Sequence, residues 1–109
     1  MGRMSRNKGK RGEREAAKEL SRILGIEARR GIQFQGGPDS PDVITELSDW
    51  LHIEVKRSER LAVYEALEQA EDDANGKVPL VLHRRNCKPW IAITYLDQLP
   101  KLSSRKSES

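Results

Sequence analysis

The sequence is poor in cysteine and has no long apolar run, and each shortage excludes a class of protein. Its single cysteine, Cys87, excludes an intramolecular disulfide, and there is no Cys/His cluster of the kind that holds structural zinc. No window approaches the length and apolarity of a membrane span, and the N-terminus lacks the apolar stretch of a signal peptide. We therefore expect a reduced, cytoplasmic protein with no membrane partner.

Motifs for nucleotide binding and for reading a base sequence are also missing. The chain has neither a P-loop nor a Gly-rich dinucleotide turn, so we expect no nucleotide cofactor. Nothing resembles a helix-turn-helix. Aromatic residues make up only 5% of the chain, and we expect them in the core or at a subunit interface rather than in a base-stacking platform. If the protein binds nucleic acid, these absences favour recognition of the shape of the nucleic acid over recognition of its base sequence.

Charge is plentiful and lies unevenly along the chain. The 109 residues carry a net charge of +3, with 34% charged and 36% hydrophobic residues, which fits one small globular domain. The first twelve residues contain five basic residues and no acidic one, and more basic residues follow near the C-terminus. We expect a flexible basic arm over 1–11, a folded domain over 12–100 and a flexible basic tail over 101–109. Such ends can neutralise phosphates, or they can simply keep the termini hydrated.

Hydrophobic periodicity predicts an alternation of helices and strands. Helical spacing of apolar residues appears twice, and runs rich in β-branched residues lie between and after the two helices. A helix that connects two strands favours parallel pairing of those strands. The expected fold is an α/β mixed five-stranded sheet flanked by helices, with helices at 12–24 and 60–75 and strands at 28–35, 42–47, 50–56, 78–84 and 90–96.

Several charged residues interrupt this apolar pattern. Glu13 shares the inward stripe of the first helix, because it lies three and four positions before the apolar residues Ala16 and Ala17. Along 50–56 every second residue is apolar, so Glu54 and Lys56 project together from the opposite face of the strand. Charges on a packed face are costly unless they are paired or bind a metal.

The spacing of the two strands indicates what these charges could do. If Leu47-Ser48-Asp49 forms a three-residue loop, Asp42 lies opposite Glu54, with about 5 Å between their Cβ atoms. Two carboxylates this close repel each other and raise a pKa unless a cation lies between them. Mg²⁺ or Mn²⁺ suits such oxygen ligands, and the Lys56 ammonium on the same face can offset charge on a phosphate.

Each of these residues also has a simpler explanation. Glu54 and Lys56 could belong to a solvated strand face, and Glu13 could favour the dipole near a helix start. Asp42 could cap a turn after Pro41. The chain also offers a second Pro-Asp pair that ends at Asp39, but Asp42 is favoured because it directly precedes the strand.

The combination resembles a known family. "PDV" at 41–43 and "IEVK" at 53–56 look like the signature of the PD-(D/E)xK nuclease superfamily. Within it, "KGKRGEREAAKEL" at 8–20 and "HIEVKRS" at 52–58 are similar to archaeal-type (Hjc-like) Holliday junction resolvases, with Gly9, Glu13 and Arg14 matching a Gly-x-x-x-Glu-Arg segment. The resemblance spans roughly residues 8 to 95, nearly the whole expected domain.

The resemblance implies a restriction-endonuclease-like fold and a metal-dependent site. It implies that Glu13, Asp42 and Glu54 bind Mg²⁺, with Mn²⁺ as a substitute and with a backbone carbonyl from Val55, and that Lys56 is catalytic. The family's serine-containing loop is replaced here by "FQGGPDSPD", which leaves Gln35 or Ser40 as uncertain substitutes. The superfamily sometimes uses a helical glutamine, which makes Gln69 a further accessory residue; a surface position is the other reading.

The implied substrate is branched DNA. A resolvase nicks four-way junctions, in recombination, in repair or in phage DNA processing, and paired nicks on symmetric strands call for a homodimer. Such a protein would work in the cytoplasm of a bacterial or archaeal cell or of a phage-infected host. The alternatives are another branched-DNA or nicking nuclease, or a DNA-binding module without catalysis. The residues expected to contact DNA are Arg6, Lys8, Lys10, Arg11, Arg14, Arg29, Arg30 and Arg57.

Overall fold

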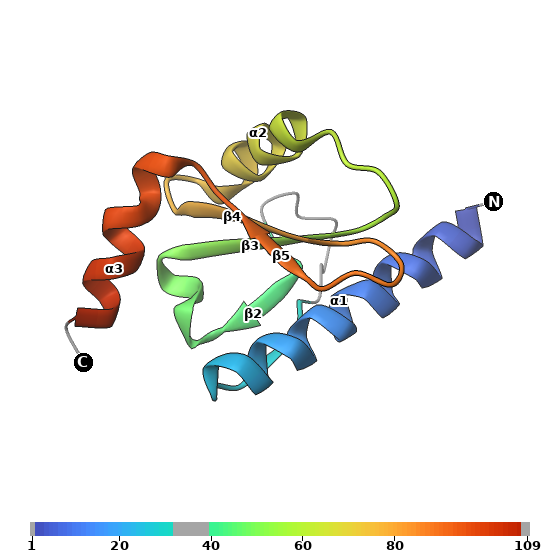
Figure 1. Cartoon of the computed structure of the whole chain (residues 1–109), viewed down its shortest axis with the longest axis horizontal. Helices are drawn as coiled ribbons and strands as arrows, with labels where there is room; N and C mark the ends of the chain where they lie inside the picture. Colours follow the sequence, from blue (N-terminus) through green and yellow to red (C-terminus); the bar gives the residue numbers. More distant parts are fainter. Residues whose placement is uncertain (1, 32–39, 108–109) are drawn as a thin grey trace.

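The predicted order of a helix, three strands, a helix and two strands is present, and a further helix follows the last strand (Figure 1). The structure, a computed structural model, describes residues 2–31 and 40–107. Its elements are α1 (Gly2–Leu24), β1 (Ala28–Arg30), β2 (Val43–Thr45), the 3-10 turn η2 (Glu46–Asp49), β3 (Leu51–Arg57), α2 (Val63–Ala74), β4 (Val78–Arg84), β5 (Ile91–Ile93), the 3-10 turn η3 (Leu96–Gln98) and α3 (Leu99–Ser107).

The strands form one five-stranded mixed sheet in the order β1-β2-β3-β4-β5. β3 and β4 pair in parallel from Leu51↔Val78 to Arg57↔Arg84, and the other three pairs are antiparallel. The parallel pair follows from α2, because a crossover helix returns the chain to the same end of the sheet. The expected α/β class and the parallel pairing are therefore confirmed.

Helices cover both faces of this sheet. In Figure 1, α1 lies along one face and α2 along the other. One apolar cluster joins Ala16 and Ala17 of α1 to Val43, Leu51, Ile53, Val78 and Leu82, and a second joins Ala66, Leu67 and Ala70 of α2 to Val81. Small alanines at both contacts let the helices approach the sheet closely. Because α2 covers its face, the polar residues on that side of β3 are not a solvated row: His52 is 2% exposed and Glu54 is 7% exposed.

The register of β2 against β3 decides the geometry of the site. Val43 pairs with Ile53, which is the register expected from the sequence. Continued by one residue, it brings Asp42 next to Glu54. The link between the strands is the turn η2, in which the Leu47 amide donates to Thr45 Oγ1 (2.8 Å) and the Thr45 amide donates to Ser48 Oγ (3.0 Å). This capping box fixes where β3 begins.

The ends of the chain differ from the expectation. Residues 2–11, expected to form a flexible arm, continue α1, and most of the expected tail belongs to α3. The segment 2–11 has no proline or β-branched residue to oppose a helix. It also has almost no apolar residues, so periodicity carries no signal there. Gly25 ends α1 as expected, with φ +68°, but Ile23 and Leu24 are 60% and 50% exposed rather than packed.

β1 ends at Arg30, Gly31 is not part of a strand, and residues 32–35 of the predicted strand 28–35 lie outside the described residues. Across 2–31 and 40–107, no helix combines the length and the apolar character that a membrane crossing needs.

Gly31 offers a test of this packing. Its amide donates to the carbonyl of Asp42 (2.8 Å), and a Cβ added there would lie 2.2 Å from the carbonyl oxygen of Pro41, which belongs to the backbone and cannot rotate away. We expect Gly31→Ala to lower the free energy of unfolding in urea by about 1–3 kcal/mol. Gly9→Ala is the matched control, because nothing lies within 4 Å of its added Cβ. Equal stability of the two variants would contradict the close approach of these segments.

Candidate functional site

Asp42 lies buried at the entrance to β2 and is held by the neighbouring strand. Its Oδ2 accepts a hydrogen bond from the Val55 amide (2.8 Å), and its own amide donates to the carbonyl of Ile53 (2.9 Å). The side chain and the backbone of Asp42 are thus both tied to β3. This fixes the carboxylate beside Glu54 rather than in the turn.

Three carboxylates share this region and act on one another. Burial, and then the charge of Glu54, raises the pKa of Asp42 from 3.8 to about 7, although the bond from Val55 opposes the shift; Glu13 adds to it. Burial also raises the pKa of Glu13, where Arg30 opposes the shift and Glu54 adds to it. Crowded, buried carboxylates of this kind are stabilised by a bound cation.

Arg30 provides part of that positive charge. Its Nε lies 3.5 Å from Glu13 Oε1, a long ion pair between half-buried side chains. The same Nε is buried without a hydrogen-bond partner among the described residues. A weakly held guanidinium next to an acidic cluster can also reach an oxyanion such as a phosphate.

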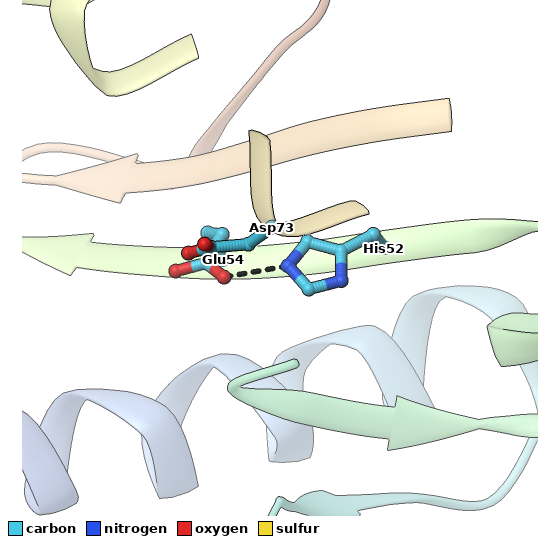
Figure 2. Close-up of side chains that lie close together, drawn as sticks. All are labelled: His52, Glu54 and Asp73. Carbon is cyan, nitrogen blue, oxygen red and sulfur yellow. Dashed lines mark hydrogen bonds and ion pairs between the residues drawn. The ribbon is translucent and has the colours of Figure 1, made fainter. Parts of the chain in front are cut away.

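Glu54 belongs to a second group of potential ligands (Figure 2). His52 Nε2 lies 2.6 Å from Glu54 Oε2, and Asp73 approaches the same carboxylate from α2. One ligand atom from each of the three lies within 4.8 Å of the others. Glu54 therefore connects this cluster to Asp42 and Glu13.

Sequence reasoning did not select Asp73. A signal for it exists: Asp73 follows the buried Ala70 by three positions on α2, so it interrupts an apolar stripe just as Glu13 does on α1. The sequence pattern puts His52 on the face of Glu54, where it could touch DNA, shape the pocket or be a neutral strand residue; the structure buries it against Glu54.

Lys56 lies two residues beyond Glu54 on β3. Its Nζ donates to Gln69 Oε1 of α2 (3.3 Å). The lysine is half-buried and the glutamine is exposed. The structure thus brings together two residues that were selected separately from the sequence. Their catalytic and accessory roles stay predictions.

The residues expected to contact DNA have several different surroundings. Lys10, Arg11, Arg14 and Arg29 are exposed. Arg6 and Lys8 are in α1 but outside the residues whose side chains are described, and Gln35 lies outside the described residues altogether. Ser40 is half-buried beside Pro41.

Arg57 is engaged inside the protein. It pairs with Glu15 of α1 (Nε to Oε1, 3.3 Å) and donates to the carbonyl of Arg84 (3.3 Å) and to Asn86 Oδ1 (2.9 Å). Glu15 also pairs with Arg84 (2.8 Å), so one carboxylate joins α1 to the ends of β3 and β4. The sequence placed Glu15 off the apolar stripe and suggested no such role.

Comparison with known proteins supports this interpretation of the fold. The chain has the fold of an Hjc-like nuclease, with the five-stranded mixed sheet and flanking helices described above. One solved structure that matches is that of Hjc from Archaeoglobus fulgidus, a Holliday junction resolvase from an archaeal hyperthermophile. The two are 28% identical with a TM-score of 0.55, and the match covers 80% of this chain and 72% of that chain. No protein-family model and no curated protein sequence matches the chain.

A resolvase-like fold implies a divalent metal, and the donors present fit one. Glu13, Asp42, Glu54 and Asp73 offer carboxylate oxygens, which suit hard divalent cations. The charges of Glu54 and Glu13 contribute to the raised pKa of the buried Asp42 carboxyl, and a bound cation would offset these charges.

The raised pKa of Asp42 makes stability depend on pH. Between about pH 4 and pH 7 the folded protein keeps the Asp42 proton that the unfolded chain has lost, so without metal the free energy of unfolding falls as pH rises through this window. One such group contributes at most about 1.4 kcal/mol per pH unit. Urea titrations in EDTA should give a flatter pH profile for Asp42→Asn than for the wild type. Parallel profiles would show that Asp42 does not titrate in this range.

The His52–Glu54 contact makes a separate prediction about stability. His52→Leu leaves the buried Glu54 carboxyl without its imidazole partner, so we expect the free energy of unfolding to fall by about 1–3 kcal/mol at neutral pH. His52→Gln, which keeps a donor, should lose less. Urea denaturation measures both. Leucine as well tolerated as histidine would mean that the hydrogen bond contributes nothing to the fold.

Proposed function

We propose that this protein is a Mg²⁺-dependent, structure-selective endodeoxyribonuclease that nicks four-way DNA junctions as a homodimer. The observation that carries the proposal is the placement of Asp42 next to Glu54 by the register of β2 and β3, with Lys56 one step further along the same face. The match to Hjc supports the choice of a junction as the substrate.

Glu13, Asp42 and Glu54, with the backbone carbonyl of Val55, are proposed to hold Mg²⁺, for which Mn²⁺ substitutes. When bound, such a cation lowers the pKa of a coordinated water and offsets negative charge on a phosphate. His52 keeps one oxygen of Glu54 occupied through the bond at 2.6 Å. The other oxygen is then free to face Asp42 and the ion.

Lys56 is proposed to act on the phosphodiester directly. Its ammonium, held by Gln69, orients the attacking water and offsets negative charge on the non-bridging phosphoryl oxygens as the P–O bond to water forms and the P–O bond to the leaving oxygen breaks. Arg30 is proposed to contact the same phosphate through its guanidinium, whose side chain is 24% exposed and is paired only at 3.5 Å with Glu13. Two copies of the site would make the paired nicks that resolve a junction.

Cleavage of labelled substrates tests the proposal. With Mg²⁺, a four-way junction should be nicked symmetrically while a linear duplex of the same sequence is left intact, and EDTA should stop the reaction. Asp42→Asn and Lys56→Ala should each lower the nicking rate by at least about 10²-fold, because the first removes a proposed ligand of the cation and the second removes the cationic group proposed to act on the reacting phosphate. Junction affinity, measured by fluorescence anisotropy in EDTA, should change little.

Lys18→Ala is the matched control for Lys56→Ala, because Lys18 is exposed on α1. The Lys18→Ala protein should cleave the junction at the wild-type rate. Cutting of every DNA tested would favour a general nuclease with the same chemistry. Binding without any cut in Mg²⁺ or Mn²⁺ would refute catalysis and leave a DNA-binding module. Loss of binding in both active-site variants would mean that the site is structural.

A further inference from the structure

A second concave surface lies beside the candidate site, at the carboxyl ends of β3 and β4. It is a hollow of about 560 Å³ between the segment that leads into α2, the end of β4 and the beginning of β5. Its floor is apolar, and its rim carries Arg60, Arg85 and Lys88. No residue of the acidic cluster lines it.

The hollow opens on the same face of the sheet as the candidate site. Glu54 pairs with Val81, which packs against α2, and side chains two residues further along each strand share that face. Lys56 is therefore the neighbour of His83, which lines the hollow. Adjacent strands lie about 4.8 Å apart, so the hollow begins one strand away from Lys56. In open α/β sheets, ligands bind outside the carboxyl ends of the strands.

Hydrogen bonds hold the walls of this hollow in place. Glu59 Oε2 accepts a bond from the Asn86 amide (2.7 Å), and His83 Nε2 lies 2.9 Å from the carbonyl of Ser58. Arg84 Nε donates to the carbonyl of Lys88 (2.6 Å). The walls are thus formed before any ligand arrives, which lowers the entropy cost of binding.

These bonds also decide which charges remain available. The carboxylate of Glu59 is engaged with a backbone amide, and the guanidinium of Arg84 is paired with Glu15. Within the described part of the chain, no ion pair involves Arg60, Arg85 or Lys88, and all three are exposed. Three cations above an apolar floor suit a ligand with anionic groups and an apolar body.

We propose that this hollow binds the sugar–phosphate backbone of the DNA strand next to the phosphate that is cut, with phosphates at Arg85 and Lys88 and a deoxyribose against Ile91 and Ile93. The proposal rests on the proposed function for the place of the cut phosphate. Among the described residues that line the hollow there is no Phe, Tyr or Trp, and the His83 ring is held by the carbonyl of Ser58, so the hollow offers no broad platform for base stacking. It binds the strand whatever its sequence, which agrees with recognition by shape.

The salt dependence of DNA binding tests this. Arg85→Gln/Lys88→Gln removes two phosphate contacts, so the slope of log K against log salt should become shallower by about 2. At moderate salt the affinity for a labelled junction, measured by anisotropy in EDTA, should fall about 10-fold or more. Lys18→Gln/Lys77→Gln removes the same charge from exposed sites away from the hollow and should leave the slope unchanged. Lys88→Arg should keep wild-type binding.

A chemical probe locates the contact on the DNA. Replacing single phosphates near the cut with neutral methylphosphonates should weaken wild-type binding at one or two positions. The Arg85→Gln/Lys88→Gln protein should be insensitive at those positions, because the two changes remove the same contact. Equal sensitivity in both proteins, or a slope that falls no more than in the control, would overturn the proposal.

The outcomes separate this inference from the proposed function. A protein that binds DNA through Arg85 and Lys88 but never cuts a junction would leave the hollow as a DNA site and refute the nuclease. A protein that cuts junctions and binds DNA equally well without the Arg85 and Lys88 charges would support the nuclease and refute the hollow as a DNA site. A wild-type protein that binds no DNA would overturn both.

Discussion

The hydrogen bond from the Val55 amide to the carboxylate of Asp42 is the interaction on which the site depends. It joins the first residue before β2 to the middle of β3, and it draws a buried acid toward another buried acid. The cost of that crowding appears in the pKa of Asp42, which rises to about 7. A site in which buried carboxylates repel one another without metal gains more stability from a bound cation than a site whose carboxylates are far apart. The register of β2 against β3 therefore sets both the position of Asp42 and the repulsion that it experiences from Glu54.

Much of the fold was predictable because it follows from local periodicity. The period of two along β3 placed Glu54 and Lys56 on one face, and α2 between two strands required β3 and β4 to run in parallel. The length of the link through η2 was enough to set Val43 against Ile53. The spacing of charged residues within these elements then predicted the proximity of Asp42, Glu54 and Lys56. Each of these inferences uses only residues that are close in sequence.

What escaped prediction depends on contacts between distant elements. Glu15 contacts Arg57 and Arg84 only because α1 crosses the ends of two parallel strands, and nothing in its neighbourhood along the chain indicates this. His52 is buried because α2 covers its face of β3, whereas the sequence pattern alone makes that face look polar and exposed. Asp73 reaches Glu54 from a helix whose rotation about its axis is set by alanine packing. The N-terminal part of α1 was missed because residues 2–11 have no apolar pattern.

The parallel pairing of β3 with β4 also bears on how the site comes into being during folding. Paired residues in these strands are separated by 27 positions, so no local turn can bring them together, and closing this crossover costs more chain entropy than closing the short link through η2. The hairpin of β2 and β3 can collect Asp42 and Glu54 early, from nearby segments. Gln69, Asp73 and the hollow beside β4 join them only when the crossover closes. We therefore expect Asp42 and Glu54 to come together before the residues that α2 and β4 add to their surroundings.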